Sequence, residues 1–254
     1  TEVPPPGGAD HTLDDIAPPS PEAARRTIQI HREVFAKAGL TDAFSRVLGV
    51  VVQPGVEFGN RNTVRYDSHR AQALSAVLND APGLVFEAHS TDYQGTAPLA
   101  ALVRDGFPIL KVGPELTFVL REALYALDLI AGELLDDYPP RQLARTMERI
   151  MCASPDHWQR HYSGSGAALR VLRHYSLSDR IRYYWPEGAA QDAVETLLSA
   201  LRGQCVPRQL FWQYLPAAQT FADAPLNPED LLIWRVSESL KTYHAACHPT
   251  EHEG

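Results

Sequence analysis

Three short, largely apolar segments alternate with helix-type patterns in the first half of the chain. The apolar segments are residues 47–52, 84–88 and 109–112. The first segment lacks the alternation typical of a half-exposed strand and the second is a short buried strand, so we expect strands covered on both faces, as in a parallel sheet. The helical patterns that follow them are residues 68–79, 98–105 and 116–135. Three strand–loop–helix units in series are typical of an α/β barrel or a doubly wound sheet.

Helical patterns also dominate the rest of the chain. A helix is expected after Ser20, which can cap it, with Pro21 at its first position and Gly39 at its end. Beyond residue 136 the expected helices are 140–153, 155–162, 189–201 and 228–246, while 207–214 fits a strand or a helix. We therefore expect residues 136–254 to form a helical extension packed on the unit formed by residues 1–135, within one domain.

Composition narrows the class of protein. The chain has 254 residues, 44% of them hydrophobic and 21% charged, which is ordinary for a water-soluble globular fold. A net charge of −8 favours neither nucleic acid nor an anionic membrane as a partner, and no apolar run is long enough to cross a bilayer. The opening Thr1-Glu2-Val3-Pro4 lacks the features of a signal peptide and reads as the middle of a longer sequence. Three widely spaced cysteines favour a reduced, cytoplasmic protein with buried thiols.

Charged and polar residues follow each predicted strand. They are Gln53 and Glu57 after the first strand, Glu87, His89, Thr91 and Asp92 at the second, and Lys111 and Gly113 at the third. The carboxyl ends of parallel strands meet at one edge of a sheet, where active sites of such folds lie. We therefore expect these groups to share one rim.

Three interpretations of this rim stay open. Glu57, Glu87 and His89, with Asp92 nearby, could bind a divalent metal such as zinc, although a single histidine is few for catalytic zinc. Lys111 and the amides around Gly113 could hold the phosphate of a sugar phosphate. The charges could also form a structural ring of salt bridges. Nearby acids would keep the Lys111 amine charged, which disfavours a Schiff base.

Two arginines stand beside an aromatic cluster further along the chain. Arg180 and Arg182 precede or flank Tyr183, Tyr184 and Trp185. They could grip a phosphate, or pair with a strand-end acid inside aromatic packing. Among the patterns missing from the chain are the P-loop, the dinucleotide fingerprint and the nucleophile elbow. The other histidines, including His174, are expected on solvated helix surfaces.

Long stretches of the sequence are similar to one family. They are residues 51–58, 86–94, 109–114, 120–123 and 178–186, together with the opening Thr1-Glu2-Val3-Pro4 and Gly7-Gly8. On these stretches the chain resembles the non-catalytic subunit of class II D-tagatose-1,6-bisphosphate aldolase, a family also labelled tagatose-6-phosphate kinase. The resemblance extends to about Cys247.

The resemblance implies a (β/α)8 barrel in which residues 1–135 supply strands six to eight. It implies a cytoplasmic protein that stabilises and activates a separate, zinc-dependent catalytic subunit in the catabolism of galactitol, N-acetylgalactosamine and tagatose. In this role Glu57, Glu87, His89, Asp92, Lys111, Gly113, Arg180 and Arg182 would form a sugar-phosphate pocket, real or vestigial. The alternatives are a metal-dependent sugar-phosphate aldolase or isomerase active on its own, and a kinase, against which the missing P-loop argues.

The chain departs from this family at its amino terminus, where family members extend well beyond it. Three strands alone would leave an apolar sheet edge unpaired. We therefore expect the natural product to be longer, or this piece to pair with another chain.

Overall fold

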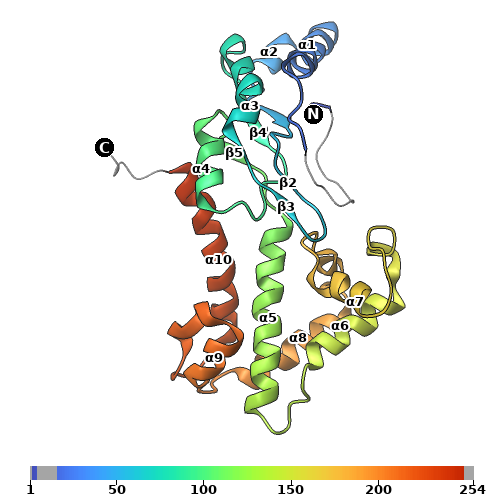
Figure 1. Ribbon diagram of the computed structural model, residues 1–254, viewed down its shortest axis with the longest axis vertical. Helices are drawn as coiled ribbons and strands as arrows, with labels where there is room; N and C mark the ends of the chain where they lie inside the picture. The colour runs from blue at the N-terminus through green and yellow to red at the C-terminus, as the bar shows by residue number, and fades with distance from the viewer. Residues whose placement is uncertain (1, 5–15, 249–254) are drawn as a thin grey trace. The chain divides into compact units, whose positions relative to one another are not determined.

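A computed structural model describes residues 2–4 and 16–248 of the chain (Figure 1). It is a mixed α/β structure, rich in helices, with a small parallel sheet. The chain divides into two compact units, one of Thr1–Gly113 with Lys241–Gly254 and one of Pro114–Leu240. The boundary expected after residue 135 thus lies at the end of a helix that belongs wholly to the second unit. No helix in the described ranges is long and apolar enough to span a membrane.

The first unit is built on three parallel strands in the order β1-β4-β5. They are β1 (Gly49–Val52), β4 (Val85–Ala88) and β5 (Ile109–Leu110), which confirms the three predicted strands. Their register aligns Val51 with Glu87 and Glu87 with Ile109. On the far side of β1, Glu2 forms a parallel bridge with Val51, and the Val3 amide donates to the Val51 carbonyl at 2.9 Å. The amino-terminal segment therefore extends the parallel pattern by one position.

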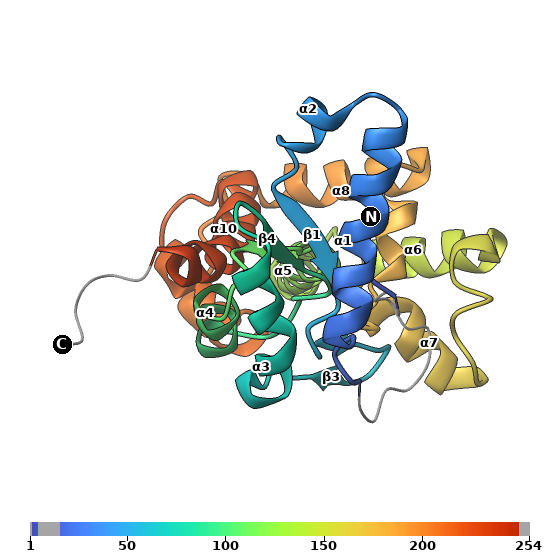
Figure 2. The same ribbon diagram turned by 90° about the horizontal axis from the view of Figure 1, so that it is seen from above.

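Only one face of this sheet carries the buried core of the unit. Val50, Val52, Phe86 and Ala88 are buried in one cluster with side chains from the carboxyl end of α10 (Pro228–Cys247) and from three other α-helices. The helices are α1 (Pro21–Lys37), α3 (Ser68–Ser75) and α4 (Thr96–Arg104), seen around the sheet in Figure 2. The alternate positions are less buried, and Ile109 is 40% exposed. The expectation of strands covered on both faces is therefore wrong for these residues, because the packed helices use one face.

Local signals explain the helix ends of this unit. The Ser20 hydroxyl accepts from the Ala23 amide, Pro21 opens α1, and Gly39 follows it with a φ of +70°. Asp67 caps α3 in the same way through the His69 amide. The remaining elements are α2 (Thr41–Phe44), the 3-10 helix η1 (Ala76–Asp80) and a hairpin of β2 (Glu57–Phe58) and β3 (Thr63–Val64). The hairpin occupies part of what the sequence predicted as a loop.

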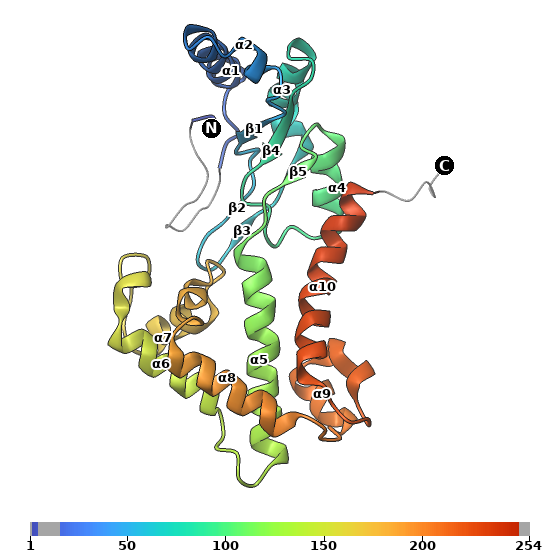
Figure 3. The same ribbon diagram turned by 180° about the vertical axis from the view of Figure 1, so that it is seen from behind.

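The second unit is helical. Its α-helices are α5 (Pro114–Leu134), α6 (Gln142–Ala153), α7 (Gly166–Tyr175), α8 (Gly188–Leu201), α9 (Arg208–Tyr214) and the first part of α10 (Pro228–Cys247) (Figure 3). Short 3-10 helices are η2 (Pro155–His157), η3 (Arg180–Tyr184) and η4 (Pro216–Phe221). The ambiguous segment 207–214 is thus helical, whereas the helix expected over 155–162 is only a 3-10 turn.

The core of this unit collects apolar side chains that are shielded from water. Leu127, Ile130, Leu143, Met147 and Leu197 are among its fully buried members. The cysteines do not follow their prediction. Cys152, Cys205 and Cys247 are exposed free thiols. Cys152 and Cys247 lie at the carboxyl ends of α6 and α10, and Cys205 forms an isolated bridge with Pro225.

Candidate functional site

The loop after β4 is fastened to the end of β5 by hydrogen bonds. The Thr91 amide and hydroxyl both donate to the Lys111 carbonyl, at 3.1 and 2.9 Å. The Asp92 carboxylate accepts from the Gly113 amide at 2.9 Å. The Tyr243 hydroxyl, near the carboxyl end of α10, donates to the Thr91 carbonyl at 3.0 Å. These contacts bring the chain after the second and third strands to one rim, as the sequence predicted.

Backbone strain marks the same loop. Ser90 and Tyr93 have φ values of +58° and +62°, a region that non-glycine residues rarely occupy. Ser90 is buried, so its conformation is held by surrounding packing. Strained residues of this kind persist only where neighbouring contacts over-determine them, and they cluster at functional sites.

The β2–β3 hairpin is bound to this loop by Gln94. The Gln94 side-chain oxygen accepts from the Tyr66 amide and its nitrogen donates to the Val64 carbonyl, both at 3.0 Å. The rings of Phe58 and Tyr93 meet edge to face with centroids 5.6 Å apart. Glu57 is thereby held close to the loop, fully buried, and one of its carboxylate oxygens accepts from the Phe58 amide at 3.0 Å.

His89 is the centre of the polar contacts at the rim. Its Nδ1 lies 3.0 Å from a Glu2 carboxylate oxygen and 3.5 Å from the Lys111 Nζ. The shorter contact indicates that Nδ1 carries the proton and donates it to Glu2. The second ring nitrogen, Nε2, then keeps its lone pair and can act as a base. A carboxylate–histidine pair of this kind orients the base in many hydrolases and lyases.

Lys111 is exposed and, among the residues that the structure describes, forms no ion pair. Among the described residues its ammonium makes one side-chain contact, the 3.5 Å one to His89 Nδ1, and this nitrogen already lies closer to Glu2. An ammonium without a strong partner beside a histidine base can stabilise a developing oxyanion or bind a phosphate. The rim therefore combines a proton acceptor with an available positive charge.

Not every predicted rim residue is available for a ligand. The Gly113 amide is occupied by Asp92, so it does not offer a free donor to phosphate. Glu87 lies in β4 two positions before His89, hence on the same face of the strand, and is half-buried. Within residues 2–4 and 16–248, no three His, Cys, Asp or Glu side chains gather as a metal site. The described residues thus do not fit a metal centre made of Glu57, Glu87 and His89.

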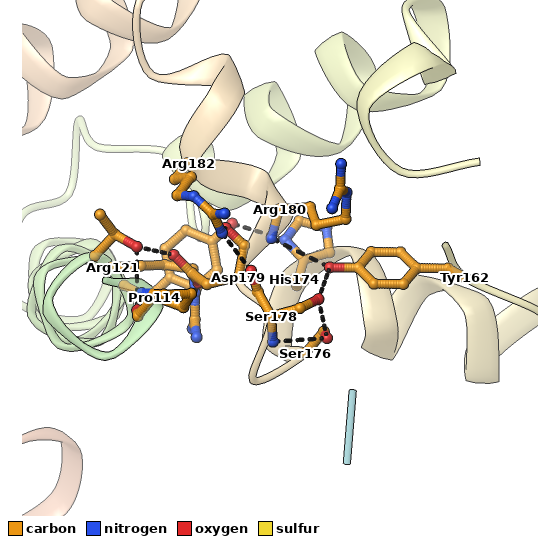
Figure 4. Close-up of polar contacts among 11 residues, drawn as sticks. Pro114, Arg121, Tyr162, His174, Ser176, Ser178, Asp179, Arg180 and Arg182 are labelled. Carbon is orange, nitrogen blue, oxygen red and sulfur yellow. Dashed lines mark hydrogen bonds and ion pairs between the residues drawn. The ribbon is translucent and has the colours of Figure 1, made fainter. Parts of the chain in front are cut away.

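A second polar cluster lies inside the helical unit. Arg121 of α5 is buried, and its Nε donates to Asp179 at 3.0 Å; the Thr117 hydroxyl donates to the other Asp179 oxygen at 2.6 Å (Figure 4). Asp179 has a φ of +45° and is buried as well. Burial raises the pKa of Asp179, while the Arg121 charge and the Thr117 hydrogen bond oppose the rise. The cluster holds the turn that precedes η3.

The side chains of Arg180 and Arg182 bind backbone carbonyl groups at this turn, and not a carboxylate. The Arg180 guanidinium donates to the His157 carbonyl, and Arg182 donates to the carbonyls of Ser178 and Asp179. Both guanidinium groups lie over the Tyr183 ring, at 5.3 and 4.5 Å from its centroid. Within the second unit, as far as the structure describes it, neither arginine forms an ion pair with a carboxylate. The arginine with a buried acid partner is Arg121, and no local sequence pattern distinguishes it.

The prediction for His174 is also wrong, since this histidine was expected on a solvated helix surface. It is buried, and its Nδ1 lies 2.7 Å from the Tyr125 hydroxyl while its Nε2 lies 3.0 Å from Glu148. Burial lowers the pKa of His174 to about 4, so the ring is neutral near pH 7. Arg173 forms a two-point ion pair with Glu148. Burial raises the pKa of Glu148, but the bonds and charges of Arg173 and His174 outweigh this and lower it below the usual value.

Comparisons with known proteins agree with the resemblance seen in the sequence. A protein 58% identical over 252 residues is the D-tagatose 6-phosphate 4-epimerase of Agrobacterium fabrum (strain C58 / ATCC 33970); the match covers 99% of this chain and 59% of that protein. A crystal structure of a probable tagatose 6 phosphate kinase from Sinorhizobium meliloti 1021 superposes with a TM-score of 0.85 at 48% identity, covering 93% of this chain and 61% of that one. The chain therefore spans about three fifths of each relative. The family model for the D-tagatose-1,6-bisphosphate aldolase subunit GatZ/KbaZ-like matches residues 1–248, and the chain belongs to this family.

Proposed function

We propose that this chain is the carboxyl-terminal part of a sugar-phosphate 4-epimerase that acts on D-tagatose 6-phosphate. The observation that carries the proposal is the 58% identity, across 99% of the chain, to a protein of that name. The Glu2–His89–Lys111 contacts support it, because they supply the base and the cation that the reaction needs. In this proposal the three strands and the Glu2 bridge are the last strands of a (β/α)8 barrel.

The chemistry links the epimerase name of the relative to the aldolase name of the family. Epimerisation at C4 of a ketose phosphate can proceed by cleavage and re-formation of the C3–C4 bond, the bond that an aldolase breaks. A base takes the C4 hydroxyl proton, the C3–C4 bond breaks, and its electron pair remains on C3 as an enediolate. The new aldehyde turns its other face, C3 attacks it, and the alkoxide recovers the proton. Atoms and electrons balance without a further reactant.

The rim residues can supply the two groups that this reaction needs, a base for the hydroxyl proton and a cation for the enediolate. His89 Nε2 carries a lone pair when Nδ1 donates to Glu2, so His89 is the proposed proton acceptor. The Lys111 ammonium lies beside it and is the proposed partner of the enediolate oxygen. Glu2 is a positioning residue, because its carboxylate sets the tautomer of His89.

A chimera tests the activity. We would replace the matching 252-residue region of the Agrobacterium fabrum epimerase with this chain and follow conversion of D-tagatose 6-phosphate to its C4 epimer. A chimera that catalyses this conversion would support the proposal. A chimera that folds, as judged by cooperative thermal unfolding, but shows no turnover contradicts it.

Two substitutions in the active chimera test the roles of the rim. His89→Gln is expected to lower kcat by a factor on the order of 10²–10⁴, the usual contribution of a general base. Lys111→Gln is expected to lower kcat with little change in KM if the ammonium stabilises the enediolate. A rise in KM alone would instead assign Lys111 to the phosphate. Lys37→Gln, at the exposed end of α1, is the matched control and should leave both constants unchanged.

The family description favours a second candidate function. As a D-tagatose-1,6-bisphosphate aldolase subunit, the protein would stabilise and activate a separate catalytic subunit in carbohydrate catabolism, without turnover of its own. Mixing the same chimera with such a catalytic subunit separates the two candidates. Stimulated bisphosphate cleavage together with absent epimerase activity would select the subunit role.

A further inference from the structure

A cavity of about 710 Å³ between α6 and α7 is lined by four arginines. The two helices belong to the second unit and contact each other (Figures 1 and 3). Arg141, Arg145 and Arg149 come from α6 or its amino-terminal end, and Arg170 comes from α7. The chain as a whole carries a net charge of −8, so this concentration of positive charge runs against its average.

The charges of these arginines are not neutralised within the unit. Arg149 donates only to the Thr146 hydroxyl at 3.0 Å, and Arg141 only to the Tyr175 hydroxyl at 3.4 Å. The side chains of Arg145 and Arg170 form no hydrogen bond or ion pair with the residues that the structure describes. The one acid in the lining, Glu148, is already bound by Arg173 and His174. The cavity therefore keeps an excess of positive charge.

The arrangement is unfavourable for the helix itself. Arg141, Arg145 and Arg149 follow one another at a spacing of four residues, which places like charges on one face of α6, about 6 Å apart per step. The first two lie at the amino-terminal end, where the helix dipole disfavours cations. Arg141 also has a φ of +57°. The repulsion between like charges and the position of cations at the amino-terminal end of α6 are both unfavourable, and a bound anion would offset both.

We propose that this cavity binds a small molecule carrying two phosphate groups, at a site separate from the His89 rim. A row of guanidinium groups about 12 Å long from Arg141 to Arg149 can contact phosphates at both ends of one extended molecule. Arg170 approaches from the facing helix. Tyr175, 43% exposed, and His174 supply an aromatic wall for the uncharged middle of the ligand. The volume lies in the range of small-molecule sites.

The proposal does not depend on the epimerase assignment, because its residues lie outside the rim. The probe is D-fructose 1,6-bisphosphate, titrated into the purified chain by calorimetry, with D-fructose as the uncharged comparison. The variants are Arg145→Gln and Arg170→Gln, singly and together. Arg160→Gln is the matched control, since Arg160 is also exposed, lies in the same unit and does not line the cavity.

We expect the bisphosphate to bind, with affinity falling on the order of ten-fold for each arginine removed. The Arg160 control should bind like the unchanged protein, and added salt should weaken binding. Protection from hydrogen exchange in α6 and α7 would locate the ligand. The two substituted arginines are exposed, so cooperative unfolding should be preserved and is checked in each variant.

Three results would overturn the proposal. The unchanged protein could fail to bind the probe. Binding could survive the double substitution but disappear in Lys111→Gln, which would place the ligand at the rim. The double variant could lose a complex with a protein partner while no phosphate compound binds, which would make the arginine row a protein interface.

Discussion

Arg121 and Asp179 show how a single buried ion pair can fix a turn. Both side chains are almost completely shielded from water, and Arg121 also lies over the rings of Phe118 and Tyr175, at 4.1 and 5.4 Å from their centroids. The Nη2 atom of Arg121 is buried without a hydrogen-bond partner among the described residues. The aromatic faces thus take the place of a hydrogen-bond acceptor for Nη2. The charge of each member is compensated only while the other is present.

Removing one member of this pair should destabilise the protein strongly. Asp179→Asn leaves the Arg121 charge buried and uncompensated, so we expect a loss of roughly 3–5 kcal/mol in the free energy of unfolding. Asparagine tolerates the left-handed backbone at this position, so the loss reports the charge. Asp223→Asn is the control, because Asp223 has a φ of +61° but pairs with Arg208 at the surface. Its expected change is below about 1 kcal/mol by urea denaturation; equal losses for both variants would refute the argument.

His174 makes stability depend on pH. Its folded pKa of about 4 lies below the ordinary value of 6.5, so between these values the unfolded chain binds a proton that the folded chain does not. Stability is therefore complete above pH 6.5 and decreases as the pH falls toward 4, by roughly 3 kcal/mol in all. Glu148, with its lowered pKa, acts in the same direction at lower pH.

Urea denaturation at several pH values between 7 and 4 measures this slope. His174→Gln should flatten the dependence between pH 6.5 and 4, whereas His69→Gln, at an exposed position on α3, should leave it unchanged. An unchanged slope in His174→Gln would show that another group titrates.

At the scale of elements, Asp128 of α5 takes over the capping of α6. Its carboxylate accepts from the Leu143 and Ala144 amides at 3.1 and 3.0 Å and from the Tyr138 hydroxyl at 2.7 Å. Arg141, at the cap position itself, offers no side-chain cap. A residue thirteen positions upstream therefore satisfies the first amides of the helix.

Asp128→Ala should uncover these amides in a buried place. We expect a loss of about 2–4 kcal/mol, more than a surface cap contributes, because three donors lose their acceptor. Faster hydrogen exchange should begin at Leu143 and Ala144. Asp67→Ala, which removes the single-bond cap of α3, provides the scale, and an equal or smaller loss for Asp128→Ala would contradict this account.

The elements differ in how far the sequence could predict them. The apolar runs and the turn residues Ser20, Pro21 and Gly39 act locally, so three strands and α1 were predictable. The rim was predictable in part, because parallel strands place His89 and Lys111 at one edge. The Glu2 contact, the Asp128 cap and the Arg121–Asp179 pair join residues far apart in sequence, which no local pattern reveals. Burial of His174 likewise depends on how α5, α6 and α7 pack.

At the scale of the whole molecule, the two units differ in how complete their cores are. The helical unit is one continuous segment, Pro114–Leu240, with its own cluster of buried side chains. The other unit contains a sheet in which β5 pairs on one side only, among the strands that the structure describes. A short parallel sheet with an open edge is a poor candidate for independent stability.

We therefore expect residues 114–240 to fold when expressed alone and residues 1–113 to aggregate or remain unfolded. Circular dichroism with thermal unfolding checks both fragments. A cooperative transition is expected for the first and none for the second. A helical fragment that melts without cooperativity would show that its core needs the rest of the chain.

The hydrogen bond from Tyr243 to the Thr91 carbonyl has a practical consequence for protein engineering. The last turns of α10 belong to the compact unit that carries His89, so the carboxyl end of this helix is part of the scaffold behind the rim. An affinity tag or reporter fused directly after Cys247 would disturb the packing of this helix end. A flexible spacer between the helix and the tag would avoid the disturbance. Truncation before Tyr243 should lower the stability of the unit that carries His89, because it removes the donor to the Thr91 carbonyl.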